Sequence, residues 1–301
     1  MMSDSTNSSA TRLLPFVAAA AGVGLLSLMD AFMKEAALAT GAYTATVLRS
    51  IFGAAIIAPV WLLRKNAWPT RAAFKLHMER GIVSAFMALS FFFALTKLPL
   101  AEAIAISFVA PLVALYFARI FLGEVIQPKA IFASLLGFAG TLVIVGGRIG
   151  QSTLDNDTAM GLAALLFSAL LYAYNFIVIR RQSQLAGPIE IATFHSGVGG
   201  IVLLLFAPFL GTTPLPEAFA PIGAAALLTV IGAMAMAWAF ARAETQALVP
   251  FEYTGFLWAS LFGWVFFRET VTPTTLAGTA LIVTGCYLAT RKSKAATASP
   301  A

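Results

Sequence analysis

The chain has 301 residues, of which 60% are hydrophobic and 11% charged, with a formal net charge of +6 at pH 7. Soluble domains carry about 25% charged residues, so this composition excludes a soluble globular fold and indicates an integral membrane protein. Most basic residues lie in short segments between apolar runs, which argues against a nucleic-acid partner. The single cysteine excludes an intramolecular disulfide and a metal site built from several cysteines.

The first 12 residues are polar and predict a disordered tail. Ten apolar runs follow, each long enough to cross a bilayer as a helix. Because each run is continuously apolar rather than alternating, we expect helices and not the strands of a barrel. The predicted spans cover residues 13–33, 42–63, 77–96, 100–122, 128–147, 158–179, 188–210, 219–241, 247–267 and 273–290.

An offset of 145 residues relates the two halves of the chain. Glu124 stands four residues before Pro128, and Glu269 stands four residues before Pro273. Five spans in each half place the second copy the opposite way up, and such inverted repeats are typical of secondary transporters with a site near the bilayer midplane. The predicted organisation is a tail over 1–12, five-helix repeats over 13–147 and 158–290 around a central cavity, and a cytoplasmic tail over 291–301.

Lysine and arginine are unevenly divided between the two sides of the predicted bundle. With the N-terminus in the cytoplasm, the opposite side holds only Lys34, Lys97, Arg148 and Arg268. Because positive loops remain on the cytoplasmic side, this asymmetry predicts that both termini are cytoplasmic. The largest cytoplasmic group, from the end of the second span to the start of the third, is Arg64, Lys65, Arg71, Lys75 and Arg80.

Two stretches resemble each other and a known family. They are LAEAIAISFVAPLVALYFARIFLGEVIQP at residues 100–128 and ALVPFEYTGFLWASLFGWVFFRETVTP at residues 247–273. In both, an apolar helix runs into a glutamate and then a proline-led helix. This pattern, over about residues 13–291, resembles the EamA family of the drug/metabolite transporter superfamily. The resemblance implies a ten-helix basket in the inner membrane that exports or exchanges amino acids, drugs or other metabolites.

The second repeat departs from this family pattern at one proline. Phe256 stands where the first repeat has Pro111, and we expect the helix kink to move to Pro250. The segment 250–254, together with an aspartate and a lysine near the end of the first span, resembles a subgroup of S-adenosylmethionine carriers. Uptake or exchange of S-adenosylmethionine is therefore the alternative substrate prediction.

Ionisable residues inside the spans are the first candidates for a site, because a charge at a helix centre costs about 2.5–3.5 kcal/mol on insertion scales. Glu252 is predicted to bind substrate or a coupling proton, or to form an ion pair with Arg49 that only holds helices together. Arg49 would bind a substrate carboxylate with its planar fork, or pair with Asp30 or Glu252. Asp30 and its repeat mate Asn175 form a polar pair that fits a central site or a helix-helix hydrogen bond.

The remaining candidates are a histidine and three aromatic residues. His195 is a structural histidine or a site residue. The aromatic side chains would stack on a substrate or hold a cation over a ring, or pack the helices. Phe93 and its repeat mate Trp238, and also Tyr253 beside Glu252, are the aromatic candidates.

Glu124 and Glu269 allow two readings. Each precedes a proline that opens a helix, where a carboxylate suits the positive helix end. Alternatively, each is part of a gate that breaks and reforms on one face of the membrane. Pro111 and Pro250 are the predicted kinks beside these gates.

Motif searches exclude several function classes. The chain has no HExxH and no GxxxxGK[ST] pattern, and of its two histidines His77 falls in a predicted loop. We therefore expect no enzyme activity, no metal, no cofactor and no ATP-driven transport. The prediction is a secondary transporter of small metabolites in the lipid bilayer, driven by protons on Glu252 or by exchange. An uncoupled facilitator is the alternative of another class.

Overall fold

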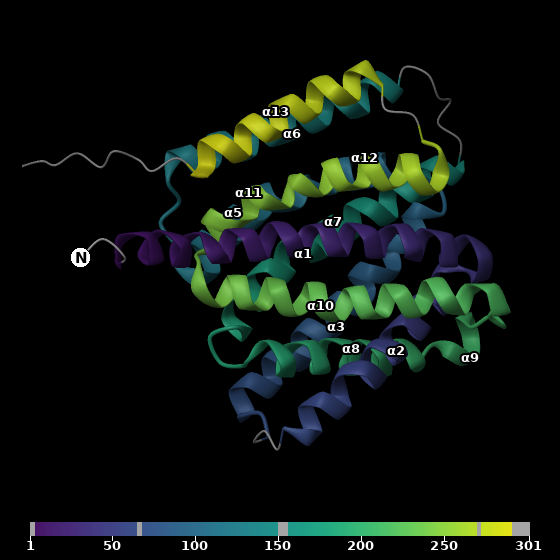
Figure 1. Cartoon of the computed structure of the whole chain (residues 1–301). Helices are drawn as coiled ribbons and strands as arrows, with labels where there is room; N and C mark the ends of the chain where they lie inside the picture. The colour runs from purple at the N-terminus through teal and green to yellow at the C-terminus, as the bar shows by residue number, and fades with distance from the viewer. Residues whose placement is uncertain (1–3, 65–67, 150–155, 270–271, 291–301) are drawn as a thin grey trace, which may run out of the picture.

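The computed structural model describes residues 4–64, 68–149, 156–269 and 272–290, and every element in these ranges is a helix (Figure 1). The all-α prediction is confirmed. The elements are α1 (Asp4–Thr40), α2 (Ala42–Leu63), α3 (Arg71–Leu95), α4 (Leu100–Ser107), α5 (Val109–Phe117), η1 (Ala118–Leu122), α6 (Pro128–Ile149), α7 (Asn156–Gln182), α8 (Pro188–Leu204), α9 (Ala207–Leu210), η2 (Pro216–Ala218), α10 (Phe219–Arg242), α11 (Thr245–Glu252), α12 (Thr254–Phe267) and α13 (Pro273–Thr290).

Five of the helices in the described part of the chain are long and apolar enough to cross a membrane. They lie at Leu13–Thr40, Ala42–Leu63, Arg71–Leu95, Asn156–Gln182 and Pro216–Arg242. Shorter apolar helices cover Pro128–Gly140, Pro188–Leu204 and Thr254–Phe267. The molecule is therefore a multi-pass membrane protein built from helices.

The first helix begins at Asp4, so residues 4–12 are helical where their polar composition predicted a disordered tail. This part of α1 contains neither glycine nor proline. Lengthening an existing helix needs no new nucleus, so the helix of the apolar span continues into the polar sequence. The predicted tail over 291–301 lies outside the described residues.

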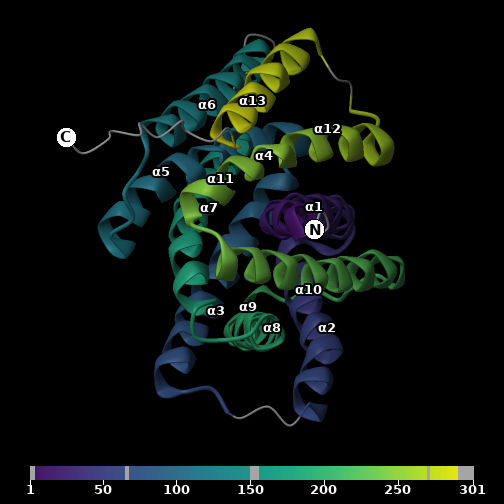
Figure 2. The same cartoon turned by 60° about the vertical axis from the view of Figure 1, so that its left-hand side comes forward.

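The helices of the two halves correspond by the same offset of 145 residues. The bounds of α4 shifted by this offset are those of α11, and α5 and α6 begin 145 residues before α12 and α13. Contacts correspond as well, because α1 packs on α10 as α7 packs on α3. Helices α6 and α13 lie side by side at one edge of the bundle in both views (Figures 1 and 2).

These two edge helices pack closely and run antiparallel. Gly285, late in α13, faces Ala133, early in α6. A Cβ at Gly285 would meet the Ala133 carbonyl oxygen at 2.8 Å, a contact that only glycine avoids. Small residues allow this close approach of helices in membranes.

The fourth and ninth predicted spans are each broken once, at repeat-related positions. Phe108 separates α4 from α5, and Tyr253 separates α11 from α12. Pro111 lies in the first turn of α5, where its missing N–H is tolerated. Pro250 lies inside α11, and the helix breaks three residues later, at Tyr253. The rings of Phe108 and Tyr253 pack against each other, so the two breaks lie next to each other.

Helices η1 and α12 end in the same backbone conformation. Gly123 and Arg268 follow these helices with φ of 68° and 56°, both in the left-handed region. The N–H of the next residue, Glu124 or Glu269, donates back to the carbonyl six residues earlier, at 3.3 and 3.1 Å. The bond is one residue wider than in the Schellman motif, where it spans five residues, and it fixes the backbone at the two glutamates in the same way in both halves.

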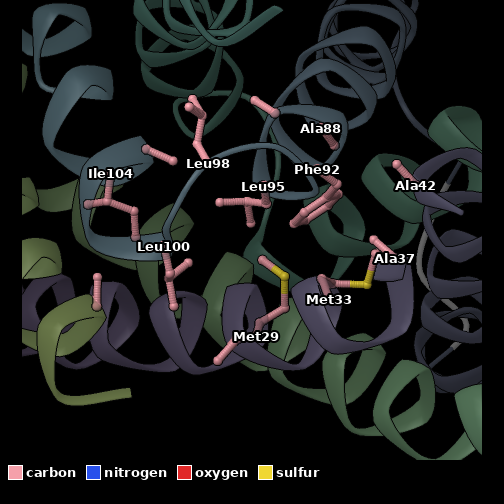
Figure 3. Close-up of a cluster of buried hydrophobic side chains, with 14 of the residues drawn as sticks. Met29, Met33, Ala37, Ala42, Ala88, Phe92, Leu95, Leu98, Leu100 and Ile104 are labelled. Carbon is pink, nitrogen blue, oxygen red and sulfur yellow. The ribbon is translucent and has the colours of Figure 1, made fainter. Parts of the chain in front are cut away.

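Buried apolar side chains join the first half of the bundle. Figure 3 shows Met29 and Met33 of α1 facing Phe92 and Leu95 of α3, with Leu100 of α4 beside them. This core packs α1, α3 and α4 together, and these helices also line the central cavity.

Candidate functional site

A cavity of about 200 Å³ lies inside the bundle. Its lining side chains come from α1–α4, α7, α8 and α10–α12, and thus from both halves of the chain. Asp30, Asn175, Arg49, His195 and Glu252 all line it. The structure therefore brings together five of the polar residues that the sequence singled out.

The acidic part of the cavity wall contains Glu252 and Asp30. Glu252 is 7% exposed, and the hydroxyl of Tyr172 donates to its Oε2 at 2.6 Å. Its other oxygen, Oε1, is buried and has no hydrogen-bond partner among the described residues. Asp30 and Tyr172 line the same cavity. Tyr172 was not predicted, because nothing in the sequence distinguishes it from Tyr174 of the same helix, whose hydroxyl bonds to Glu79 instead.

The basic part of the wall contains Arg49. Its Nη1 donates to Thr229 Oγ1 at 3.1 Å, and its guanidinium lies 5.2 Å from the centroid of the Phe92 ring. Its Nε is buried without a partner among the described residues. Asp30, the other predicted partner of Arg49, lines the same cavity. The predicted ion pair with Glu252 is not formed, because each of these two side chains bonds to a hydroxyl instead.

Arg80 is a second arginine in the basic wall, although the sequence placed it among loop residues. It lies inside α3, is 4% exposed and lines the cavity. Its Nε donates to Asn175 Oδ1 at 3.1 Å. His77 also lies inside α3 rather than in a loop. Both fall at the start of the predicted span 77–96, but the prediction counted them with the basic loop in front of it, whereas neighbouring helices bury both side chains.

His195 completes the basic wall. Its Nδ1 is buried with no hydrogen-bond partner in the described part of the chain. A smaller pocket beside the cavity is lined by His195 and Arg49 together with the hydroxyl groups of Thr46, Ser50 and Ser196. An unsatisfied imidazole nitrogen and an unsatisfied guanidinium N–H thus lie next to the same polar space, which is suited to an anionic group or ordered water.

The aromatic predictions need correction. Phe91 and Phe92 line the cavity, whereas Phe93 does not, because successive residues on a helix turn by about 100°. Trp238 also faces away and lies 4.0 Å beneath the guanidinium of Arg242. Tyr253 is fully buried against other side chains rather than in the cavity wall.

Ion pairs occupy both predicted gate positions, at opposite ends of α3. Lys34 Nζ lies 2.9 Å from Glu269 Oε1, and Arg180 Nε lies 3.7 Å from Glu124 Oε1. Lys34 also donates to the carbonyl of Leu98, just beyond the end of α3, at 3.2 Å. Arg180 lies near the end of α7, which contacts the first half of α3. The side chain of each glutamate therefore pairs with a basic residue of the opposite half, while its backbone N–H bonds to the end of its own helix.

Comparisons with known proteins agree with this architecture. The model of the EamA-like transporter family matches residues 13–146 and 159–291, and the chain belongs to that family. It is 28% identical to the pseudopaline exporter CntI of Pseudomonas aeruginosa over 273 residues, which cover 89% of this chain and 93% of that protein. It is also 28% identical to a riboflavin transporter of Rhizobium johnstonii over 235 residues, covering 75% and 73% of the two chains.

A solved crystal structure shares the fold. It superposes with a TM-score of 0.72 over 92% of this chain and 96% of that chain, at 21% sequence identity. The protein is thus a membrane transporter of small metabolites, as the sequence predicted.

Proposed function

We propose that this protein exports or exchanges a small metabolite that carries both a positive and a negative group, such as an amino acid, by alternating access. The observation that carries the proposal is the division of charge around one cavity. Glu252 and Asp30 would bind the cationic group, and Arg49 and His195 the anionic group. Each of Glu252, Arg49 and His195 has a buried atom free for this purpose among the described residues.

The proposed architecture is ten membrane crossings in two inverted repeats, residues 13–147 and 158–290, with the cavity between them. The matching bounds of α4 and α11 and the antiparallel packing of α6 on α13 support it. The ion pairs at the two ends would then open in turn, so that the cavity faces one side at a time.

The proposed location is the inner membrane, with both termini in the cytoplasm. Its support is the bias of lysine and arginine. A cysteine added after Ala301 in a Cys286→Ala background tests it. An impermeant maleimide should label this cysteine only after the cells are permeabilised. Labelling in intact cells would show that the C-terminus lies on the opposite side of the membrane.

S-adenosylmethionine is the second candidate substrate. The observation in its favour is that two carboxyl side chains, Asp30 and Glu252, face the cavity, which would compensate a sulfonium beside an ammonium group. Its adenine would stack on the ring of Phe91, which also lines the cavity.

Counterflow in proteoliposomes tests the proposed function. Unlabelled aromatic amino acids, aliphatic amino acids or S-adenosylmethionine are loaded inside, and entry of the labelled compound is followed. We expect saturable exchange of one compound, lost in Glu252→Gln and retained in Glu35→Gln, since Glu35 is an exposed residue of α1 that does not line the cavity. Exchange of none would contradict both substrate classes, and non-saturable flux would indicate a facilitator.

A further inference from the structure

A chain of polar side chains leads from the cavity to one end of the bundle. Asn175 and Arg80 line the cavity, and Arg80 Nη1 donates to Gln182 Oε1 at 3.1 Å. Gln182 Nε2 lies 2.6 Å from His77 Nδ1, and His77 Nε2 lies 2.8 Å from Glu190 Oε1. His77 is fully buried, whereas the Glu190 side chain is 18% exposed. Glu190 is therefore the end of this chain that lies nearest to solvent outside the cavity.

The identity of each donor in this chain follows from Arg80. A guanidinium has only donors, so Gln182 must turn its oxygen toward Arg80. The amide nitrogen of Gln182 then donates to His77 Nδ1, which must carry no proton. The carboxylate of Glu190 accepts from His77 Nε2, which must carry one. The intact chain thus requires a neutral imidazole with its proton on Nε2.

The surroundings of His77 hold this arrangement in place. The Phe194 ring stacks on the imidazole, with centroids 4.4 Å apart and planes 12° apart. The charged groups that act on His77 are Glu190 from α8 and Arg80 from its own helix, and α7 contributes the uncharged Gln182. The imidazole can therefore change its bonding by gaining a proton more easily than by turning.

We propose that Arg80 joins Arg49 and His195 in binding the anionic group of the transported molecule, and that Gln182 and His77 are positioning residues that make this binding depend on pH. A second proton on His77 would leave two hydrogen-bond donors, Nδ1–H and the Gln182 amide N–H, facing each other with no acceptor between them. Gln182 then turns its oxygen to His77 and its NH₂ to Arg80, so Arg80 loses its bond to Gln182 and keeps only the bond to Asn175 to hold the guanidinium at the cavity wall. Affinity for the anionic group falls when His77 is protonated.

This inference rests on the proposed function for the identity of the ligand, but its proton arrangement can be tested without one. The chain contains two histidines, so ¹⁵N-histidine NMR of the full chain in nanodiscs, with His77→Gln for assignment, resolves both. We expect His77 as the Nε2–H tautomer at neutral pH. Gln182→Glu should convert it to imidazolium at the same pH, because a carboxylate accepts from Arg80 and from His77 together. An imidazolium or an Nδ1–H tautomer in the wild type would overturn the proposal.

Counterflow then tests the role of Arg80. The probes are the amino acid that exchanges and, as competitor, the corresponding amine without its carboxylate. Gln182→Met should raise the apparent KM of the amino acid about tenfold, the effect of losing one charged hydrogen bond, with inhibition by the amine unchanged. His77→Gln should keep the wild-type KM at neutral pH and remove its rise at acidic pH.

Two further outcomes separate the proposals. If Gln182→Met fails to fold, Gln182→Glu replaces it and should keep a low KM at acidic pH, because its carboxylate holds Arg80 at either charge of His77. If these variants change the apparent KM of the amino acid and the inhibition by the amine equally, or change neither, the inference is overturned while the proposed function stands. Absence of any exchange, with the NMR result as expected, would refute the proposed function alone.

Discussion

Phe108 and Tyr253 occupy equivalent positions in the two halves of the chain and touch each other. They are 145 residues apart in sequence, and their ring centroids are 4.9 Å apart with an interplanar angle of 78°. Each stands at the break between two helices of its half. Two rings that meet edge to face stabilise each other beyond simple burial, so this pair joins the two breaks beside the cavity.

We expect Tyr253→Ala to destabilise the protein strongly. The side chain is fully buried, and removing a buried aromatic ring costs about 3–5 kcal/mol. Tyr253→Phe keeps the ring and removes only the hydroxyl, which donates to the Ser134 carbonyl at 3.3 Å, for about 1 kcal/mol. Thermal unfolding in detergent compares the two variants, and equal losses would contradict a role of the ring contact.

Replacing Glu252 by glutamine should abolish any dependence of transport on protons. An amide oxygen still accepts from the Tyr172 hydroxyl, so the structure is retained while the titratable group is lost. Transport into proteoliposomes with and without an imposed proton gradient measures this. Undiminished proton coupling in Glu252→Gln would exclude Glu252 as the coupling group.

The ion pair of Lys34 and Glu269 should contribute much more to stability than an exposed pair near the same end. The side chains of Lys34 and Glu269 are 9% and 17% exposed, and breaking a buried pair costs about 3–5 kcal/mol. Lys97 and Asp157 form the control pair at 2.8 Å, with side chains 28% and 63% exposed. An exposed pair contributes about 0–1 kcal/mol.

A double-mutant cycle measures this difference. Lys34→Met and Glu269→Gln should each lower the unfolding temperature clearly, and the double variant should recover part of the loss because no buried charge is left unpaired. Lys97→Met should have little effect. Additive losses at Lys34 and Glu269 would show that the two charges do not stabilise each other.

Arg268→Gly should stabilise the protein. Arg268 has a φ of 56°, whereas its repeat mate is Gly123 with a φ of 68°. The left-handed conformation costs a residue with a Cβ about 1–2 kcal/mol, so Gly123→Ala should lose about that amount. Arg268→Ala removes the charge but keeps the Cβ, and should leave the unfolding temperature near that of the wild type. A gain in Arg268→Ala equal to that in Arg268→Gly would attribute the effect to charge.

Much of the helical framework could be predicted from sequence. The predicted ranges 42–63 and 273–290 coincide with α2 and α13, and the predicted starts at residues 100, 128 and 188 coincide with those of α4, α6 and α8. Hydropathy and the positions of prolines are properties of each segment by itself, so they predict helix bounds without knowledge of the fold. The break at Tyr253 could not be predicted in this way, because the sequence does not show that Tyr253 packs against Phe108 of the other half.

The cavity wall was only partly predictable. Glu252 and Arg49 were recognisable because a charge inside an apolar run is costly wherever it lies. Arg80 and Tyr172 were not, since one follows a basic segment and the other resembles several neighbouring aromatic residues. Phe93 and Trp238 were misplaced because the sequence does not show how each helix is rotated about its axis.

The sequence by itself determined that this protein is an all-helical membrane transporter of the EamA-like family with two corresponding halves, because composition, apolar length and repeated motifs are local properties. Only the tertiary structure decided which polar groups meet. The bonds of Tyr172 to Glu252 and of Arg80 to Asn175 span 80 and 95 residues. Such contacts depend on the rotation and packing of whole helices, which no local pattern specifies.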